Sequence, residues 1–332
     1  MKWKKLGKVF DPSTVTLPDH CTEYAQSPQV LVSENFLRIY FSCREKDATG
    51  QYLSHIAFVE MDKGLKGITR YADKTVIPLG DLGCFDEHGI FPMNVLPHQD
   101  EVWGYTCGWS RRKSVGVETS IGLVKSTDDG ITFQRCGPGP ILTASLHEPF
   151  LVGDPFVRVI QDRFHMWYIF GTSWSHQPGE KTPARVYKIG HAISDDGVSW
   201  EKEGRQIIES KLNVYESQAL PTVFFHENRY HMLFCYREAT DFRQNRQRGY
   251  RIGYAYSDDL ATWTRDDTQA GIDVSQNGWD SQMICYPHVF QLAGKVYLLY
   301  NGNEFGRHGF GLAVMETPET QITGGETESQ TQ

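Results

Sequence analysis

PFVRVIQDRFHMWYIF (155–170) and IGHAISDDGVSW (189–200) belong to a pattern that recurs along this chain of 332 residues. The pattern opens with a proline and a short apolar stretch. Five such stretches occur: PQVLV (28–32), PMNVL (92–96), PFVRVI (155–160), PTVFF (221–225) and PHVFQL (287–292). Their prolines are 64, 63, 66 and 66 residues apart. Spacing this regular indicates one supersecondary unit copied along the chain.

Each copy contains four strand signals in the same order. A second apolar run follows the proline segment and reads FLRIYF, EVWGYT, RFHMWYIF, RYHMLFCY or KVYLLYN. A third run reads HIAFVEM, IGLVKS, IGHAIS, IGYAYS or FGLAVM. Three copies then have an acidic turn, TDDGITF (127–133), SDDGVSW (194–200) or SDDLATW (257–263), whose last aromatic residue begins a fourth strand. β-Branched and aromatic residues favour strands, and Asp-Asp-Gly sequences favour tight turns.

Five copies of four antiparallel strands predict an all-β fold, a five-bladed β-propeller with four strands in each blade. The last copy lacks a fourth strand, but WKKLG (3–7) matches WEKEG (200–204). The N-terminal strand is therefore expected to complete blade five and close the ring. We expect one domain over 1–316 and a mobile polar tail over 317–332.

Two other folds are compatible with parts of this pattern. The chain could form unrelated β-hairpins, or two sandwich domains with a boundary near 136–148. Neither explains the aligned prolines or the match between the N-terminal segment and the end of the third copy. The 13% aromatic residues, 31 glycines and 15 prolines suit many short strands joined by turns.

The composition excludes several classes of partner. A formal net charge of −8 argues against nucleic acid. No apolar run is long enough for a membrane span or for a signal peptide, so a cytoplasmic protein, most simply a monomer, is expected. The seven cysteines form no CxxC pair and signal neither a disulfide framework nor a zinc site. We expect no cofactor and no metal, although one ion near His88 or His288 remains an option.

Strand order separates the acidic residues into two groups. In an antiparallel propeller blade, the start of the first strand and the loop after the second strand lie on one face, and the Asp-Asp-Gly turns lie on the other. Five carboxylates stand near the starts of the first strands, one for each copy: Glu23, Asp86, Asp154, Glu216 and Asp280. Converging carboxylates can hold one another in different protonation states, as acid-base chemistry requires. The alternative is that each acid caps a loop.

Polar and aromatic side chains are expected on the same face. A cleft with carboxylates, amides and flat aromatic rings suits a sugar, whose hydroxyl groups need polar partners and whose C–H face stacks on a ring. The candidate substrate-binding residues are Gln26, Arg44, Trp109, Trp174, Arg237, Arg243, Arg251, Tyr286, Asn301, Asn303, Arg307 and His308.

One loop is rich in arginine. The segment EATDFRQNRQRGYR (238–251) follows Arg237, and Arg307 and His308 stand in the last copy. Guanidinium groups bind phosphate and carboxylate in a bidentate way, so this side of the cleft could take a phosphorylated or an acidic sugar. The alternative is a solvated charged loop.

With these features, the chain resembles the five-bladed propeller superfamily that includes glycoside hydrolase families 43, 32, 68 and 130. It is most similar to glycosidase-like proteins associated with bacterial surface-polysaccharide genes. The resemblance covers essentially the whole chain, and its most specific segments are FDEHGIFP (85–92), YREATDFRQNRQRGYRIGYAYSDD (236–259), WDSQMICYP (279–287) and YNGNEFGRHGFG (300–311).

The resemblance implies roles for several carboxylates. Asp154 and Pro155 match the Asp-Pro of families 43 and 32, which orients the acid and tunes its pKa. Glu216 is the nearest counterpart of their general acid. Their blade-one aspartate has no match, because Glu23 and Gln26 stand at that place, so Asp86, Asp280 and Glu23 compete for the second role.

These expectations converge on a carbohydrate-active enzyme that cleaves a glycosidic bond with a pair of carboxylates. Glycosyl transfer or phosphorolysis with a phosphate bound by the arginine loop is one alternative, and a noncatalytic glycan-binding propeller is another. The turn at 126–133 also resembles a sialidase Asp box, which makes a sialidase a minor alternative.

Overall fold

The computed structural model describes residues 1–176 and 182–316, and within them the chain is almost entirely β-structure. The tail predicted over 317–332 lies outside the described residues. Three of the sheets have four strands each. They consist of β10 (Phe150–Ile160), β11 (Arg163–Ser175), β12 (Ala184–Ser194) and β13 (Glu201–Lys202); of β14 (Ser217–His226), β15 (Arg229–Arg237), β16 (Arg251–Ser257) and β17 (Thr264–Arg265); and of β18 (Cys285–Leu292), β19 (Lys295–Asn301), β20 (Phe310–Met315) and β1 (Trp3–Phe10).

A fourth sheet contains eight strands. It consists of β2 (Glu23–Val32), β3 (Phe36–Lys46), β4 (Tyr52–Asp62), β5 (Ile68–Tyr71), β6 (Gly89–His98), β7 (Glu101–Arg111), β8 (Val117–Ser126) and β9 (Gln134–Arg135). Two antiparallel runs, β2 to β5 and β6 to β9, meet in it at a single parallel pair between Ser54 and Gly89. The described helical segments are short: η1 (Pro12–Thr14), η2 (Asp267–Gln269) and α1 (Asn303–Gly306).

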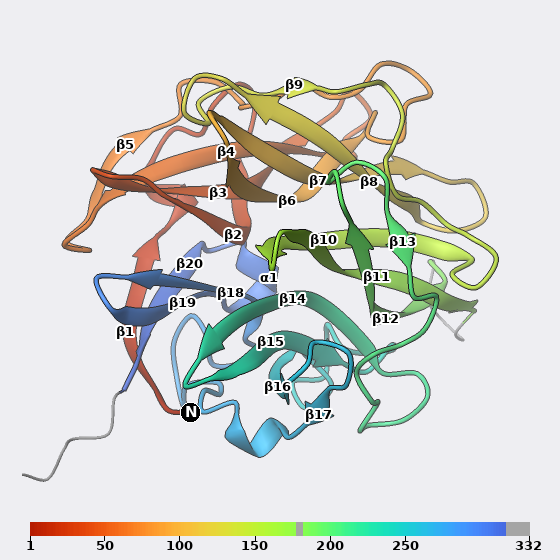
Figure 1. Cartoon of the computed structure of the whole chain (residues 1–332). Helices are drawn as coiled ribbons and strands as arrows, with labels where there is room; N and C mark the ends of the chain where they lie inside the picture. The colour runs from red at the N-terminus through yellow and green to blue at the C-terminus, as the bar shows by residue number, and fades with distance from the viewer. Residues whose placement is uncertain (177–181, 317–332) are drawn as a thin grey trace, which may run out of the picture.

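The N-terminal strand lies beside the last strand of the chain. In the antiparallel pair of β1 and β20, Trp3 is opposite Met315 and Phe10 is opposite Phe310. β1 is thus the outer strand of the last sheet, the place that the WKKLG match indicates (Figure 1). Lys5 in this strand binds Asp280, and the indole of Trp3 donates to the carbonyl of Ala270.

The five proline strands β2, β6, β10, β14 and β18 lie nearest the centre of the molecule (Figure 1). Each contacts the next in this order, and β18 contacts β2. Polar side chains connect neighbouring strands. Asn94 accepts a hydrogen bond from the amide of Val157, and His288 accepts one from the amide of Val30. The sheets therefore surround a common axis, and the starts of the proline strands converge at one end of it.

The acidic turns behave as turn-forming elements. Asp128, Asp196 and Asp259 each accept hydrogen bonds from two backbone amides of their own turn. These bonds help to hold the pKa of Asp196 at about 2. The interpretation of these residues as turn formers is confirmed.

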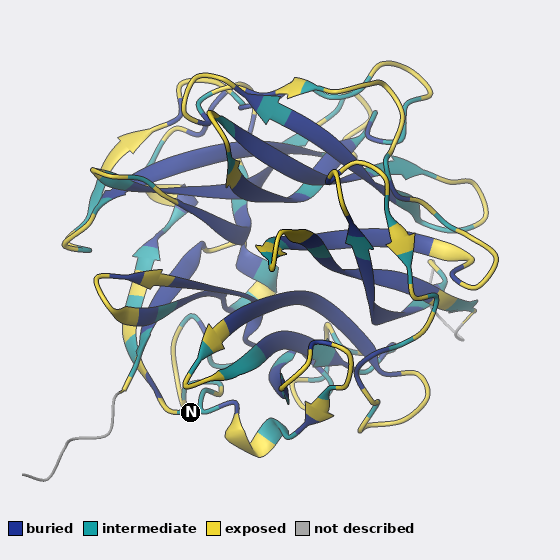
Figure 2. Ribbon diagram, viewed as in Figure 1, coloured by how far each residue is buried: buried dark blue, intermediate teal, exposed yellow. Residues whose placement is uncertain are grey.

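Apolar side chains fill the space between adjacent sheets. Trp167, Tyr168, Phe156 and Phe234 are almost completely buried, and each such side chain contributes about 2 to 3 kcal/mol of transfer free energy. Buried residues occupy the middle strands of each sheet, whereas exposed residues gather in the turns and in short outer strands such as β5 (Figure 2). Within residues 1–176 and 182–316, no helix is long and apolar enough to cross a membrane.

Candidate active site

A cavity of about 480 Å³ lies where the proline strands begin. Each of these strands contributes at least one lining residue just before its proline: Gln26, Phe91, Asp154, Ala219 and Tyr286. The ends of the second strands and the starts of the third strands supply most of the remaining wall. Of the five carboxylates expected at the mouth of the channel, Asp154 lines this cavity, and Glu23, Asp86, Glu216 and Asp280 do not.

Asp154 is an acidic side chain in this wall, and only 6% of its surface is exposed. No other acidic residue lines the cavity in the described part of the chain. Burial raises the pKa of Asp154 to about 7, although the amide of Leu220, which donates to Oδ2 at 3.3 Å, and the charge of Arg185 both favour the ionised form. Near neutral pH this carboxyl group therefore exists in both protonation states.

The local backbone explains how Asp154 reaches the cavity. Its φ is +50°, a left-handed conformation that aspartate tolerates better than most residues. The pairing of β10 with β11 shifts register on either side of Gly153. A side chain at Gly153 would place its Cβ 2.6 Å from the sulfur of Cys107, so only glycine fits there. This irregular segment turns Asp154 toward the cavity.

Four arginines line the same cavity: Arg44, Arg185, Arg237 and Arg243. Among the described residues of the wall, these four positive charges face one acidic side chain, Asp154. Arg44 donates to Gln26 Oε1 at 2.5 Å and to the hydroxyls of Ser42 and Ser54. The cavity is therefore cationic, whereas the whole chain carries a net charge of −8.

Arg237 lies deepest among these arginines, with 2% of its surface exposed. Its Nη2 donates to the hydroxyl of Tyr187 at 2.8 Å, and its Nη1 donates to the carbonyl of Glu238. The guanidinium also lies 3.6 Å from the ring centre of Phe242. Its Nε is buried and has no hydrogen-bond partner among residues 1–176 and 182–316.

Aromatic side chains form much of the remaining wall. The lining includes Tyr24, Tyr52, Phe91, Trp109, Tyr187, Phe242, Tyr250, Tyr286 and Phe305. The indole of Trp109 donates to Ser54 Oγ at 2.9 Å, which fixes the plane of its ring. A cavity with flat rings and a few directed polar groups can hold a sugar ring.

Glu216 lies outside this cavity. It is fully buried, and its carboxylate receives Arg265 Nη1 at 2.6 Å, Gln218 Nε2 at 2.9 Å and the amides of Lys211 and Leu212. Burial raises its pKa, but the bonds from Arg265 and Gln218 outweigh burial and leave the pKa below its usual value. The structure thus places an ionised, fully bonded carboxylate where the resemblance implied a general acid.

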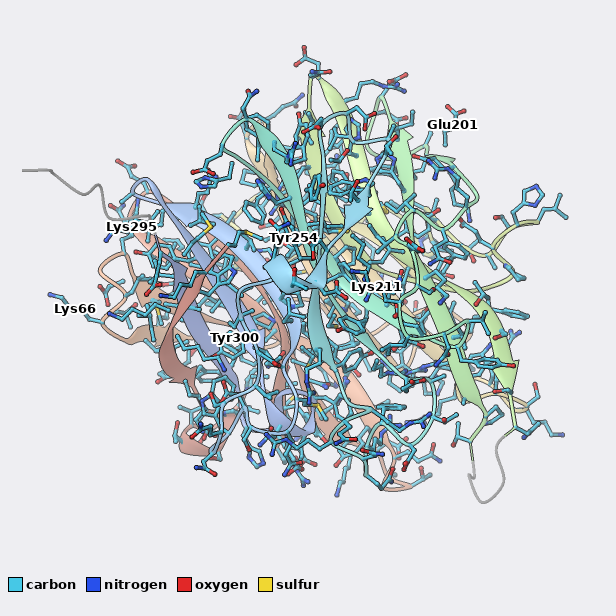
Figure 3. All side chains as sticks on the ribbon, turned by 90° about the horizontal axis from the view of Figure 1, so that it is seen from below. Lys66, Glu201, Lys211, Tyr254, Lys295 and Tyr300 are labelled. Carbon is cyan, nitrogen blue, oxygen red and sulfur yellow. The ribbon has the colours of Figure 1, made fainter. Side chains whose placement is uncertain are left out.

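Asp86 and Asp280 are also buried and also pair with a basic side chain, although Asp86 Oδ1 has no hydrogen-bond partner in the described part of the chain. Asp86 binds Arg135 at 2.6 Å, and Asp280 binds Lys5 at 2.6 Å. Neither lines the cavity. In each case the acid precedes a proline strand, β6 or β18, and the base stands on an outer strand of the same sheet, β9 or β1. Tyr300, which also bonds Asp280, lies in the interior, whereas Lys66 and Lys295 extend from the periphery (Figure 3).

The third copy contains a further pair of this kind that the sequence did not reveal. Glu148 is buried, binds Lys202 and accepts a hydrogen bond from the hydroxyl of Tyr168. It occupies the place in its sheet that Glu216 and Asp280 occupy in theirs. Asp154 stands six residues further along the chain, so it is not the equivalent of the other predicted acids.

Glu23 lies beside the cavity. Its carboxylate accepts the hydroxyl of Tyr52, a lining residue, at 2.5 Å and pairs with Arg307 at 2.8 Å. Of the four predicted acids other than Asp154, it alone contacts a side chain of the wall.

The predicted substrate-binding residues divide into two groups. Those that line the cavity are Gln26, Arg44, Trp109, Arg237, Arg243 and Tyr286, and Trp174 lines an adjoining cavity of about 470 Å³. Arg251, Asn301, Asn303, Arg307 and His308 line neither cavity. Asn301 bonds the backbones of Ser27, Ala25 and Gly309, and Asn303 bonds the amide of Gln282. Arg251 lies near Asp273, and His308 near Glu304.

Several lining residues were missed from the sequence, above all Arg185, Tyr187 and Tyr250. The third run of the third copy was read from Ile189, but β12 begins at Ala184. The alternation of Arg185 and Tyr187 before that run was the available signal. Within residues 1–176 and 182–316, no group of three or more His, Cys, Asp or Glu side chains is arranged to hold a metal ion.

Solved structures share this fold. A glycoside hydrolase superposes with a TM-score of 0.72 at 17% identity, covering 94% of this chain and 91% of that one. The β-1,2-mannobiose phosphorylase of Listeria innocua superposes with a TM-score of 0.66 at 14% sequence identity, and the match covers 95% of this chain and 96% of the phosphorylase. A thermostable family-43 glycoside hydrolase superposes with a TM-score of 0.62 at 15% sequence identity, and the match covers 90% of this chain and 91% of that hydrolase. The predicted resemblance to β-propeller glycosidases and phosphorylases is confirmed for the fold.

No family model matches the chain. Two proteins of Mycobacterium tuberculosis, uncharacterised protein MT1551 of strain CDC 1551 and uncharacterised protein Rv1502 of strain H37Rv, are each 34% identical to it over 318 residues. The alignment covers 95% of this chain and 100% of each relative. The chain therefore belongs to the family of these two mycobacterial proteins, and it has the fold of the β-propeller glycosidases.

Proposed function

We propose that this protein is a carbohydrate-active enzyme that acts on a glycosidic bond, with Asp154 as its general acid. The observation that carries the proposal is one buried carboxyl group with a pKa of about 7, in a cavity lined by aromatic rings and directed polar groups. A general acid works best when its pKa lies near the working pH. The fold of known glycosidases and a glycoside phosphorylase supports the same interpretation.

In this proposal the five proline strands form five blades, and the cavity is the mouth of their central channel. Protonated Asp154 donates its proton to the glycosidic oxygen as the bond breaks, and the sugar gains oxocarbenium character. The ring of Trp109 would stack on the sugar. Glu23 is the predicted carboxylate best placed to act as base or nucleophile, because it adjoins the cavity through Tyr52.

Asp154→Asn tests the proposal. Nitrophenyl glycosides and natural oligosaccharides are incubated with the wild type and the variant, with and without inorganic phosphate. The loss of general acid catalysis is expected to lower turnover by about 10²- to 10⁴-fold for substrates with poor leaving groups. Phosphate-dependent release of a sugar phosphate would identify phosphorolysis, and release of free sugar without phosphate would identify hydrolysis.

Asp195→Asn is the matched control. Its carboxylate is 84% exposed, belongs to an acidic turn and pairs with Arg163. The control is expected to retain wild-type turnover. If Asp154→Asn were as active as the control on substrates with poor leaving groups, Asp154 would not be the acid. Binding of a glycan without any turnover would instead favour a noncatalytic propeller.

A further inference from the structure

We propose that Arg185, Arg237 and Arg243 form an anion subsite that binds a carboxylate or a phosphate ester carried by the sugar. This inference rests on the proposed function only in taking a sugar as the ligand. It adds that the sugar is acidic or phosphorylated.

The three arginines stand where two cavities meet. All three line both the cavity of about 480 Å³ that contains Asp154 and the adjoining one of about 470 Å³. Asp154 belongs to the first cavity alone. A ligand can therefore present a glycosidic bond to Asp154 and an anionic substituent to the arginines.

None of the three guanidinium groups forms an ion pair with an acidic side chain among residues 1–176 and 182–316. Asp241 lines the second cavity, but it forms no ion pair with them in the described part of the chain. For Arg237, which is 2% exposed, this matters most, because taking a cation out of water costs several kcal/mol unless an opposite charge compensates. The missing charge is what a bound anion would supply.

Arg237 is the strongest evidence, because other buried arginines do have partners. Three arginines in the described chain are buried: Arg38, Arg237 and Arg265. Arg38 binds Glu60 at 2.5 Å, and Arg265 binds Glu216 at 2.6 Å. Arg237, at 2% exposure, has a tyrosine hydroxyl and a backbone carbonyl as partners, and its buried Nε has none.

The other two arginines reinforce the cationic character of the place. Arg243 lies over the rings of Phe242 and Phe305, with its guanidinium 4.4 and 5.5 Å from their centres. Burial, and then the charges of Arg237 and Arg185, lower the pKa of Arg243. These groups therefore repel one another, and an oxyanion between them would relieve the repulsion. The planar fork of arginine suits both carboxylate and phosphate.

Titration calorimetry at low ionic strength tests the subsite. The probes are glucose, glucuronate, glucose 6-phosphate and inorganic phosphate. At least one anionic sugar is expected to bind about tenfold or more tightly than glucose, since hydrogen bonds to charged groups are the stronger ones. Preference for glucuronate would identify a carboxylate, and preference for the sugar phosphate a phosphate ester. Equal affinity for glucose, glucuronate and glucose 6-phosphate would overturn the proposal. Inorganic phosphate that binds as tightly as glucuronate or glucose 6-phosphate would also overturn it.

Substitutions locate the effect. Arg237→Met and Arg185→Met are each expected to remove most of the preference for the anionic sugar. Arg246→Met is the matched control, because Arg246 belongs to the same arginine-rich loop and lines neither cavity. If Arg237→Met fails to fold, Arg185→Met carries the test. Loss of the preference in the control to the same extent would show a general charge effect and contradict the subsite.

Asp154→Asn separates the two proposals. Because this substitution leaves the three arginines in place, the variant is expected to bind the anionic sugar at least as tightly as the wild type. Anion binding with no turnover on any glycoside would leave the subsite standing without the catalytic proposal. Turnover of neutral glycosides by the wild type, with no preference for anionic sugars in binding, would leave the catalytic proposal standing without the subsite.

Discussion

Asp154 differs from the other predicted acids because no basic side chain of the described residues forms an ion pair with it. Glu216, Asp86 and Asp280 each bind a cation at 2.6 Å, whereas Asp154 has a backbone amide at 3.3 Å. A carboxyl side chain therefore belongs to an ion pair in three places, and in the fourth its pKa is raised to about 7. The surroundings of a carboxylate decide its role.

The raised pKa of Asp154 predicts a loss of stability with rising pH in the wild type that is absent in Asp154→Asn. With a pKa of about 7 in the folded state and an ordinary value of 3.8, the folded protein holds a proton that the unfolded chain has lost. The contribution of Asp154 to the free energy of unfolding is therefore fully present below pH 3.8 and is lost as the pH rises to about 7. Between pH 5 and 8 the variant should gain about 2 to 3 kcal/mol over the wild type.

Urea denaturation at several pH values measures this difference. In the wild type, kcat/KM should also fall above about pH 7, as the acid loses its proton, and the variant should lack this limb. A constant stability difference between the two proteins from pH 5 to 8 would contradict a raised pKa at Asp154.

The sequence could predict Asp154 because it stands directly before a proline that fixes its place in the repeat. It could not separate Asp154 from Glu216, because the partner that neutralises Glu216 is Arg265, 49 residues later. Arg185 was missed for another reason. Its strand extends five residues beyond the apolar run that indicated it.

At the scale of elements, four outer strands each carry a base that pairs with an acid just before a proline strand of the same sheet. Arg135, Lys202, Arg265 and Lys5 stand on β9, β13, β17 and β1. Lys211, whose amide binds Glu216, belongs to the loop that the pair with Arg265 holds in place (Figure 3). The pair therefore connects the two ends of one sheet.

Glu216→Gln should therefore reduce stability and leave the chemistry intact. Removing the charge leaves Arg265, whose side chain is 1% exposed, without its buried partner, although Asp267 remains. Breaking a buried ion pair costs about 3 to 5 kcal/mol, and the side-chain amide of the new glutamine should retain part of the interaction with Arg265. We expect a loss of about 2 to 4 kcal/mol in urea denaturation at pH 7.

Glu201→Gln, at an exposed position of β13, is the control and should be neutral within about 0.5 kcal/mol. Folded Glu216→Gln should keep wild-type turnover on any substrate found for the enzyme. A large fall in turnover with unchanged stability would show instead that Glu216 takes part in catalysis.

The elements were predictable from the apolar runs, but their ends were not. β11 continues past its run to Ser175, and β12 begins at Ala184. Arg185 and Tyr187 of the β12 extension line the cavity of Asp154, and Trp174 of the β11 extension lines the adjoining cavity. Apolar periodicity indicates the part of a strand that packs between sheets, so it does not register a part that faces a ligand.

At the scale of the whole molecule, the period of the prolines was enough to predict the all-β fold. It was enough because the same strand order recurs in every copy and the proline strands meet around one axis. The N-terminal strand then joins the first and last parts of the chain. Trp3 and Phe10 of this strand are 6% and 4% exposed.

Removal of residues 1–10 should consequently destabilise the entire protein. The truncated chain loses the pairing with β20, two buried aromatic side chains and the partner of Asp280. The cost is on the order of 5 kcal/mol or more, comparable with the total stability of many domains. Thermal unfolding followed by circular dichroism should show a broadened transition or none.

A chain that lacks only Met1 and Lys2, which precede β1, should unfold almost as the wild type does. If the longer truncation also melted like the wild type, β1 would not contribute to global stability.

The position before each of the regularly spaced prolines holds Ser27, Phe91, Asp154, Leu220 and Tyr286. Descent of the five units from one duplicated ancestor would account for their common strand order, while this one position has diverged in every copy. Four copies have a carboxylate and a base that connect the ends of the copy, and in the third copy this carboxylate is Glu148. The third copy could therefore acquire Asp154 as a second acid without losing this ion pair. Under such a descent, the residues that fasten the sheets would be separate from the residue proposed for the reaction.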